Sequence, residues 1–235
     1  MSRPPADISR PSRALFGRRK GHKFRPARLA LMDTVLPRLA LDLSAPPGDL
    51  RLLYPNPVEE VRLEIGFGGG EYMISQACAQ PHVGFVGVEP FVNGMAKALA
   101  ALAAHSLSNV RLHHGDATDV LAWLSPNSLA RVEMLYPDPW PKRRHWKRRF
   151  VQDNSVMAIG RVLRPGAEFR FATDVADYAA WTLEHFLRCP QLEWTAERAD
   201  DWRQPWPDFS GTRYESKAVD QGRPPCYLTF RKRSE

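Results

Sequence analysis

The chain has 235 residues, a formal net charge of +7 and a pI near 9.6. This length suits one α/β domain with a substantial core, and the positive charge favours an anionic partner such as nucleic acid. The three cysteines, Cys78, Cys189 and Cys226, lie far apart without a Cys-x-x-Cys motif. Neither a disulfide framework nor a metal site is therefore predicted, and a reducing, cytoplasmic location is expected. The sequence has neither an apolar run long enough to span a bilayer nor the apolar region of a secretory signal, so no membrane association is predicted.

Residues 1–28 are basic and proline-rich, with nine basic side chains against the single acid Asp7. Such a segment buries little apolar surface, so we predict a flexible basic arm at residues 1–28 and a single domain at residues 29–235. The arm is interpreted as a phosphate-docking segment. A solvated tail and an organelle transit peptide are the alternatives.

Residues 27–43 have the apolar spacing of a helix interrupted at Pro37, and residues 44–57 form a connector rich in proline and glycine. From residue 58 the patterns of strands and helices alternate. Strands are predicted at residues 61–66, 84–89, 110–114, 132–136, 167–172, 192–197 and 226–231. Helices are predicted at residues 71–79, 92–105, 118–124, 148–163 and 175–188. The loop at 198–225 lacks periodicity but is rich in aromatic residues, which favours an ordered lid.

This alternation predicts a doubly wound α/β sheet of seven strands that is mostly parallel. No helical pattern separates the last two strands, so the last strand is predicted to be antiparallel. In such sheets ligands bind beyond the carboxyl ends of the strands. Acidic or glycine-rich positions follow five predicted strands, at residues 64–70, Glu89, Asp116, Asp138 and Asp174.

The glycine-rich segment after the first strand includes Gly66 and Gly68, which allow a tight turn and close approach to a ligand. A dinucleotide fingerprint would place a glycine where Glu71 stands, and a carboxylate there would repel a pyrophosphate. A nucleoside without phosphates, such as S-adenosylmethionine, is therefore favoured over a nicotinamide cofactor. A glycine turn with no ligand is the alternative.

Two acids extend this candidate site. Glu89 ends the second strand, where an acid accepts hydrogen bonds from ribose hydroxyls, although a surface acid is the alternative. Asp116 follows the third strand, and two roles fit it: accepting from an adenine amino group, or capping the next helix.

Asp138 lies between Pro137 and Pro139, which stiffen the turn and direct one carboxylate outward. Trp140 follows, and it can either stack on a base or cover the edge of the core. Residues 142–149 then carry six basic side chains with His145 and Trp146 interleaved. A charge run is usually a solvated helix start, but its place beside a candidate site and its aromatic residues favour nucleic-acid binding.

Residues 137–149 read Pro-Asp-Pro-Trp-Pro-Lys-Arg-Arg-His-Trp-Lys-Arg-Arg. This stretch resembles the Pro-Asp-Pro-Trp-x-Lys-x-Arg-His-x-Lys-Arg-Arg signature of the bacterial tRNA (guanine-N7-)-methyltransferase family. Residues 212–215, Thr-Arg-Tyr-Glu, resemble its Thr-x-Tyr/Phe-Glu motif. The resemblance runs from about residue 61 to residue 232 and implies a Rossmann-like class I methyltransferase fold. It also implies methyl transfer from S-adenosyl-L-methionine to N7 of guanosine 46 in the variable loop of tRNA, giving 7-methylguanosine.

The resemblance also implies residue roles, with Asp138 both catalytic and cofactor-binding. The cofactor-binding residues it implies are Glu64, Gly66, Gly68, Glu89, Asp116 and Asp138. The implied substrate contacts are Lys142, Asp174, Thr212, Arg213, Tyr214 and Glu215. The implied RNA contacts are Arg144, His145, Trp146, Lys147, Arg148 and Arg149.

Guanine N7 has a lone pair and no proton, so no general base is required, and Asp138 is expected to orient the base and offset its developing charge. One alternative is a methyltransferase acting on another RNA base or on a protein. A second is a non-catalytic RNA-binding protein of the same fold. Glu71 and the lack of a hydride-transfer constellation disfavour an NAD-dependent dehydrogenase. The sequence leaves monomer and homodimer open.

Overall fold

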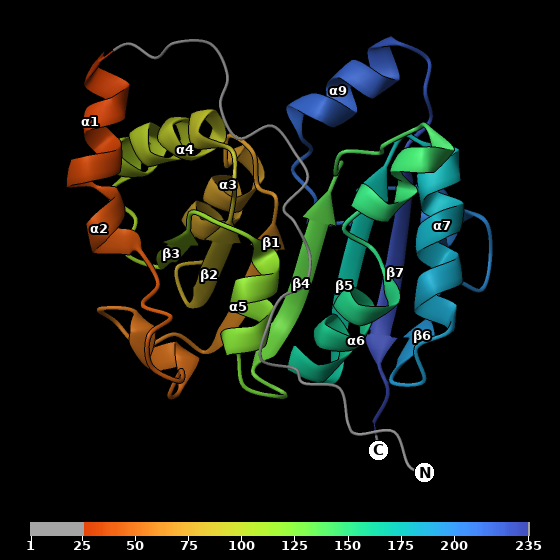
Figure 1. Cartoon of the computed structure of the whole chain (residues 1–235), viewed down its shortest axis with the longest axis horizontal. Coiled ribbons are helices and arrows are strands. Elements are labelled where there is room, and N and C mark those ends of the chain that lie inside the picture. The colour runs from red at the N-terminus through yellow and green to blue at the C-terminus, as the bar shows by residue number, and fades with distance from the viewer. Residues whose placement is uncertain (1–25, 235) are drawn as a thin grey trace.

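The computed structural model describes residues 26–234, which form one seven-stranded sheet with helices on both faces (Figure 1). The strands are β1 Glu60–Ile65, β2 Val83–Val88, β3 Val110–His113, β4 Leu129–Leu135, β5 Leu163–Thr173, β6 Leu192–Trp194 and β7 Cys226–Lys232. The α-helices are α1 Pro26–Thr34, α2 Leu36–Leu39, α3 Glu71–Ala79, α4 Val92–His105, α5 Ala117–Trp123, α6 Asp153–Val162, α7 Ala176–Leu187, α8 Asp200–Arg203 and α9 Arg213–Asp220. Two 3₁₀ helices, η1 and η2, span Leu50–Leu53 and Arg143–Arg148.

The strand order is β3-β2-β1-β4-β5-β7-β6. Strands β1 to β5 pair in parallel, whereas β7 runs antiparallel to both β5 and β6. The predicted mostly parallel sheet with an antiparallel last strand is therefore confirmed. The chain order reverses between β1 and β4, so the carboxyl ends of β1, β2 and β4 flank the switch point where doubly wound sheets bind ligands.

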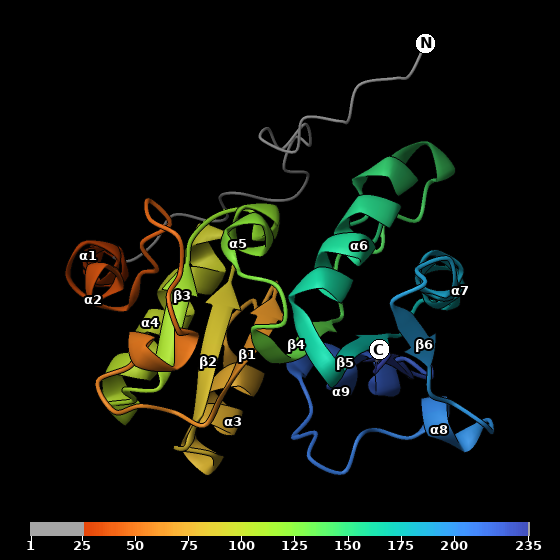
Figure 2. The same ribbon diagram turned by 90° about the horizontal axis from the view of Figure 1, so that it is seen from below.

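Helices α5, α6 and α7 cover one face of the sheet, and α3 and α4 cover the β1–β3 half of the other (Figure 2). The strands between them are apolar because both of their faces are buried, as the fully buried β2 shows. The Phe186 ring of α7 stacks on the rings of Phe169 and Phe230, with centroids 4.4 Å apart in each pair, which joins α7 to β5 and β7. This packing holds β5 and β7 together beneath α7.

The predicted helix at residues 148–163 is wrong at its start. The basic run forms the 3₁₀ helix η2, and α6 begins at Asp153, where Gln152 and Ser155 form a reciprocal capping box. The predicted strand at residues 167–172 begins earlier, because α6 leads directly into β5 at Leu163. The basic residues therefore belong to a separate 3₁₀ segment between β4 and α6.

The loop predicted at residues 198–225 contains the short helices α8 and α9. Helix α9 begins with a capping box, in which Thr212 Oγ1 accepts from the Glu215 N–H and Glu215 accepts from the Thr212 N–H. The Thr-x-x-Glu spacing is a readable signal for a helix start, and the sequence interpretation missed it.

At the amino-terminal side, the predicted helix is broken at Val35 into α1 and α2, with Pro37 in the first turn of α2. Residues 1–25 of the predicted basic arm lie outside the described residues, and residues 26–28 begin α1. Within residues 26–234, no helix combines the length and apolar character needed to cross a membrane.

Candidate active site at the carboxyl edge of the sheet

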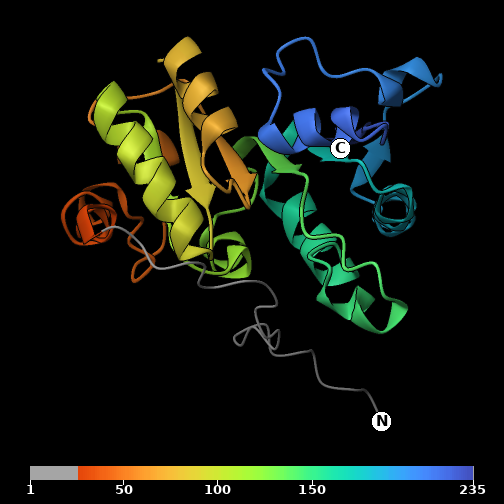
Figure 3. The ribbon, with the colours of Figure 1, turned by 90° about the horizontal axis from the view of Figure 1, so that it is seen from above.

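A cleft of about 390 Å³ opens at the carboxyl edge of the parallel strands. Its walls come from the glycine turn after β1, the end of β2, the start of α5, the segment after β4 and the start of α9. Figure 3 looks onto this edge, with α9 (blue) beside the end of β4 (green). The volume is within the range of about 300–1,000 Å³ that is usual for small-molecule sites.

The glycine turn shapes one wall of the cleft. Gly66, Gly68 and Gly70 have φ values of 74°, 58° and 76°, in the left-handed region that side chains disfavour. A Cβ added at Gly68 would lie 3.8 Å from the Tyr214 ring and 3.9 Å from the Arg213 guanidinium. The turn and the start of α9 therefore face each other across the cleft, and both Gly66 and Gly68 line it.

Two acids flank the turn on either side. Glu64 is only 6% exposed, and its Oε2 has no hydrogen-bond partner among the described residues. Burial, with the like charges of Glu133 and Glu89, raises the pKa of Glu64 well above its usual value. Glu71 is the first residue of α3 and forms an ion pair with Lys97. Glu64 does not line the cleft, but it places an unsatisfied buried acid at the end of β1.

Glu89 joins two walls of the cleft. Its Oε2 accepts from the Gly68 N–H at 2.6 Å and its Oε1 accepts from the Phe91 N–H at 2.8 Å. Burial raises the pKa of Glu89 to about 7, and the nearby charge of Asp138 acts in the same direction. Each carboxylate oxygen keeps a lone pair, so the group can still accept from ligand hydroxyls.

Asp116 fulfils the capping role that the sequence left open, because its Oδ1 accepts from the Thr118 N–H at 2.9 Å at the start of α5. It also lines the cleft. The two interpretations are therefore compatible, since one oxygen of the carboxylate can cap the helix while the other can face a ligand.

Asp138 is exposed and lines the cleft from the partly buried segment after β4. Its flanking residues Tyr136 and Trp140 have φ values of 49° and 44°, a conformation that costs non-glycine residues energy and persists only where the surroundings enforce it. Within residues 26–234, no cation forms an ion pair with Asp138. The turn therefore directs a carboxylate at the cleft without pairing it to a neighbour.

The 3₁₀ helix η2 divides the basic run into three rows, because a helix of three residues per turn aligns positions i and i+3. Arg144 and Lys147 form an exposed outer row. His145 and Arg148 form a second row toward Trp140. The Trp140–His145 centroids are 5.8 Å apart, the Arg148 guanidinium lies 5.0 Å from the Trp140 ring, and Arg148 lines the cleft.

The third row starts at the exposed Arg143 and turns toward the core at Trp146 and at Arg149, which directly follows η2. Arg149 is fully buried, its Nε donates to the Pro139 carbonyl at 2.9 Å, and it pairs with Asp177 on α7. Trp146 packs against Trp181 with ring centroids 5.4 Å apart. The interpretation of Arg149 as an RNA contact is therefore corrected, because its side chain does not reach the surface. Trp146 is partly buried, and its role as an RNA contact stays a prediction.

The remaining substrate candidates surround the start of α9. Arg213 and Tyr214 line the cleft, whereas Thr212 and Glu215 form the helix cap. The Tyr227 hydroxyl on β7 donates to Glu215, a contact that no local sequence pattern predicts.

Two further substrate candidates lie outside the lining of the cleft. Lys142 is exposed at the start of η2, and Asp174 pairs with Arg223 at 3.0 Å. In the described part of the chain, no group of three or more His, Cys, Asp or Glu side chains could hold a metal ion.

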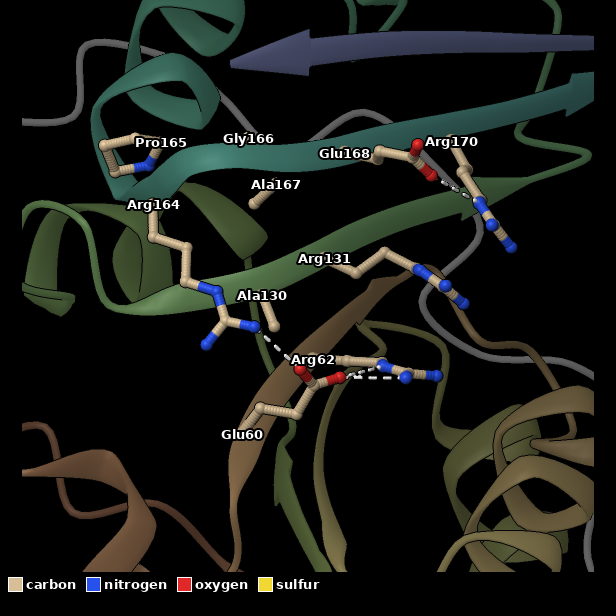
Figure 4. A pocket seen from close by; sticks show the side chains of 10 residues that line it. All are labelled: Glu60, Arg62, Ala130, Arg131, Arg164, Pro165, Gly166, Ala167, Glu168 and Arg170. Carbon is tan, nitrogen blue, oxygen red and sulfur yellow. Dashed lines mark hydrogen bonds and ion pairs between the residues drawn. The ribbon is translucent and has the colours of Figure 1, made fainter. Parts of the chain in front are cut away.

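A second cleft, of about 520 Å³, lies on the sheet face between β1, β4 and β5 (Figure 4). Its arginines have partners within the chain: Glu60 binds Arg62 at 2.8 Å and Arg164 at 2.7 Å, and Glu168 binds Arg170 at 3.2 Å. The charges there are largely balanced internally. The strand-end cleft, with its acids facing an open space, is therefore the better candidate for chemistry.

Comparisons with known proteins find methyltransferases. The family model described as "Putative methyltransferase" matches residues 58–228. A Nitrobacter hamburgensis protein named tRNA (guanine-N(7)-)-methyltransferase is 56% identical over 223 residues, covering 94% of this chain and 88% of that protein. A Bradyrhizobium diazoefficiens protein of the same name is 52% identical over 232 residues, covering 98% of each.

Among solved structures, the 16S rRNA methyltransferase KamB aligns with a TM-score of 0.56 at 16% identity, over 75% of this chain and 89% of that one. A putative methyltransferase from Thermoplasma acidophilum aligns with a TM-score of 0.50 at 21% identity, over 75% and 70% of the two chains. At these identities the likeness shows a shared class I methyltransferase fold and nothing finer.

Proposed function

The chain belongs to the tRNA (guanine-N(7)-)-methyltransferase family, and from this membership we propose that it methylates guanosine 46 in the variable loop of tRNA. The methyl donor is S-adenosyl-L-methionine and the product is 7-methylguanosine. The observation that carries the proposal is the convergence of Glu89, Asp116 and Asp138, from the ends of three neighbouring strands, on one cleft beside an exposed basic row.

The residues around the cleft fit this cofactor, which supplies an electrophilic sulfonium methyl group when bound. Glu89 is placed to accept from ribose hydroxyls, and Asp116 retains an oxygen for the adenine amino group. The unpartnered Oε2 of Glu64 offers a partner for an ammonium group, which would relieve the cost of burying that acid. Gly66 and Gly68 let the backbone approach the ligand closely.

Asp138 is proposed to act on the base rather than on the cofactor alone. Guanine N7 attacks through its own lone pair, so the carboxylate has no proton to remove. By accepting from guanine N1–H and the exocyclic amine, Asp138 would align N7 with the methyl group and offset the positive charge that forms on the ring. Asp138→Asn should therefore lower the single-turnover rate with saturating tRNA and cofactor, and a near-normal rate would contradict this role.

The surroundings of Asp138 supply the contacts that a polyanion needs. Arg144 and Lys147 face solvent and suit phosphate, whereas Arg213 and Tyr214 lie at the mouth of the cleft where a base would enter. Guanosine 46 takes part in tertiary pairing in folded tRNA, so some extrusion of the base into the cleft is expected.

Two peripheral residues complete the proposed substrate surface. Lys142 is exposed beside the basic row, and Asp174 is held near the carboxyl end of β5 by its ion pair with Arg223. Thr212 and Glu215 are proposed to act through the start of α9, which they cap.

The test is methyl transfer from labelled S-adenosyl-L-methionine to a tRNA transcript, followed by nucleoside analysis and strand cleavage at 7-methylguanosine. We expect label in 7-methylguanosine at position 46, and none in a matched transcript in which guanosine 46 is replaced by adenosine. Label in 7-methylguanosine elsewhere would refute the position alone. Label in another nucleoside or in protein would refute the guanine-N7 assignment, and tRNA binding without transfer would indicate a binding protein.

A further inference from the structure

The backbone of the segment that carries Asp138 has few N–H groups that could fix its conformation by hydrogen bonds. Three of the five residues at 137–141 are prolines, which have no N–H to donate. Tyr136 and Trp140 on either side adopt left-handed φ values of 49° and 44°. A strained turn with few donors must be held through its carbonyl groups and side chains.

Arg149 provides such a hold. Its Nε donates to the Pro139 carbonyl at 2.9 Å, directly between Asp138 and Trp140 in the chain. Its Nη2 pairs with Asp177, in the first turn of α7. One guanidinium thus ties the turn to a helix that packs on the sheet.

The surroundings of Arg149 fix the guanidinium itself. It lies 4.8 Å from the ring centroid of Trp146, 4.8 Å from that of Tyr178 and 5.3 Å from that of Trp181. The side chain has no exposed surface. A planar guanidinium held between aromatic rings donates hydrogen bonds in fixed directions. The ammonium group of a lysine, at the end of a flexible side chain, cannot reproduce this geometry.

The backbone around Arg149 is also held by hydrogen bonds. The Gln152 side chain donates to the backbone carbonyls of Trp146 and Arg149, at 3.0 Å and 3.2 Å. Trp181 Nε1 donates to the Val151 carbonyl at 2.8 Å. Trp146 and Arg149 are therefore held in the layer that α6 and α7 form, while the outer row of Arg144 and Lys147 remains at the surface.

We propose that Arg149 is a positioning residue: it sets the conformation of the Pro-Asp-Pro-Trp turn, and through it the direction of the Asp138 carboxylate, by bridging Pro139 and Asp177. The effect of Arg149 on catalysis rests on the proposed function, whereas its effect on the conformation of the turn does not. It separates Arg149 from Arg144 and Lys147, which act on phosphate.

The first test reads the turn without using activity. The chain is labelled with 5-fluorotryptophan, and the Trp140 ¹⁹F resonance is assigned with Trp140→Phe. In Arg149→Lys the Trp140 resonance should shift or broaden, while that of Trp123, which donates to the Ala45 carbonyl away from the turn, stays in place. The matched control is Arg161→Lys, which alters another arginine that donates to backbone carbonyls, at Leu121 and Leu124, away from the turn.

The second test separates positioning from RNA contact by methyl-transfer kinetics. Arg149→Lys should lower kcat by about tenfold or more, as misplacement of a reacting group does, and should leave the salt dependence of tRNA binding unchanged. Arg161→Lys should leave kcat near the wild-type value. A flatter salt dependence with normal kcat would overturn the proposal in favour of a phosphate contact.

The outcomes remain distinguishable if a variant or the proposed function fails. If Arg149→Lys does not fold, Asp177→Asn loosens the same bridge from its exposed end and should move the same Trp140 resonance. If the wild-type chain makes no 7-methylguanosine, the proposed function fails while the Trp140 resonance still tests the bridge. A Trp140 resonance unchanged in both Arg149→Lys and Asp177→Asn would refute the positioning role.

Discussion

Replacing Glu89 by glutamine should make the ligand-free chain more stable at pH 8 and less stable at pH 4.5. Burial raises the pKa of Glu89 from 4.5 to about 7, so the folded chain holds this proton more tightly than the unfolded chain does. The stability contributed by the proton is present below pH 4.5 and is lost as the pH rises through about 7. At about 1.4 kcal/mol for each pH unit, the loss amounts to about 3 kcal/mol.

Glutamine cannot ionise, so the variant avoids this loss. It has one carbonyl oxygen for the two backbone N–H groups of Gly68 and Phe91, and leaving one of them unsatisfied costs about 1–2 kcal/mol at every pH. The two effects give a variant about 1–2 kcal/mol less stable than the wild type at pH 4.5. At pH 8 the variant should be about 1–2 kcal/mol more stable.

Urea unfolding of both proteins without cofactor, at intervals between pH 4.5 and pH 8, measures this difference directly. Groups other than Glu89 titrate in both proteins and largely cancel in the comparison. The two stability curves should cross between pH 5 and pH 7. Curves that stay parallel over the whole range would refute the buried, proton-holding state of Glu89.

The same substitution should abolish tight binding of S-adenosyl-L-methionine in calorimetry. Wild-type affinity should weaken as the pH falls below about 7, because the ligand hydroxyls need the ionised carboxylate as acceptor. A Glu89→Gln variant that still binds the cofactor tightly would show that the ribose lies elsewhere. The ionised Glu89 carboxylate is thus expected to lower the stability of the ligand-free chain and to provide the acceptor that the ligand hydroxyls need.

Three further outcomes follow from the site. Asp116→Asn, which keeps a capping oxygen, should unfold within about 0.5 kcal/mol of the wild type, whereas Asp116→Ala should lose about 1 kcal/mol in urea unfolding; equal losses would contradict the cap. The double variant of Arg144 and Lys147 to alanine should reduce the slope of log affinity for tRNA against log salt by up to about 2, and an unchanged slope would exclude phosphate contacts. Tyr227→Phe, which removes the donor to Glu215, should speed hydrogen exchange in α9 and cost about 1–2 kcal/mol; unchanged exchange would show that the cap alone holds the helix.

Most strands and helices were predictable from the sequence because both faces of the sheet are buried and the apolar patterns are strong. Helices α3 and α4 match the predicted residues 71–79 and 92–105 at both ends. The basic run was misassigned because six cations within eight residues carry no apolar periodicity that could distinguish a 3₁₀ turn from an α-helix. The start of α9 was missed although its Thr212–Glu215 capping signal was present.

The candidate site was predictable to the extent that topology alone determines it. Parallel strands bring their carboxyl ends to one edge, so Glu89, Asp116 and Asp138 meet there whatever the details of packing. The role of Arg149 could not be predicted in the same way. Its burial depends on Asp177 and Trp181 of α7, about thirty residues later in the chain, and no local pattern contains a tertiary contact of that kind.

The structure explains how one carboxylate can remain available beside so much positive charge. The cations of the basic run that follows Asp138 are directed elsewhere: Arg149 to Pro139 and Asp177, and Arg148 to the Trp140 ring. The others, Lys142, Arg143, Arg144 and Lys147, are exposed to solvent. A direct ion pair would satisfy Asp138 and compete with the base for its oxygens. Because η2 has three residues per turn, Arg149, which bonds to the turn, is separated from Arg144 and Lys147, which face solvent. Asp138 therefore remains open to the cleft, and the exposed row remains available to an anionic partner.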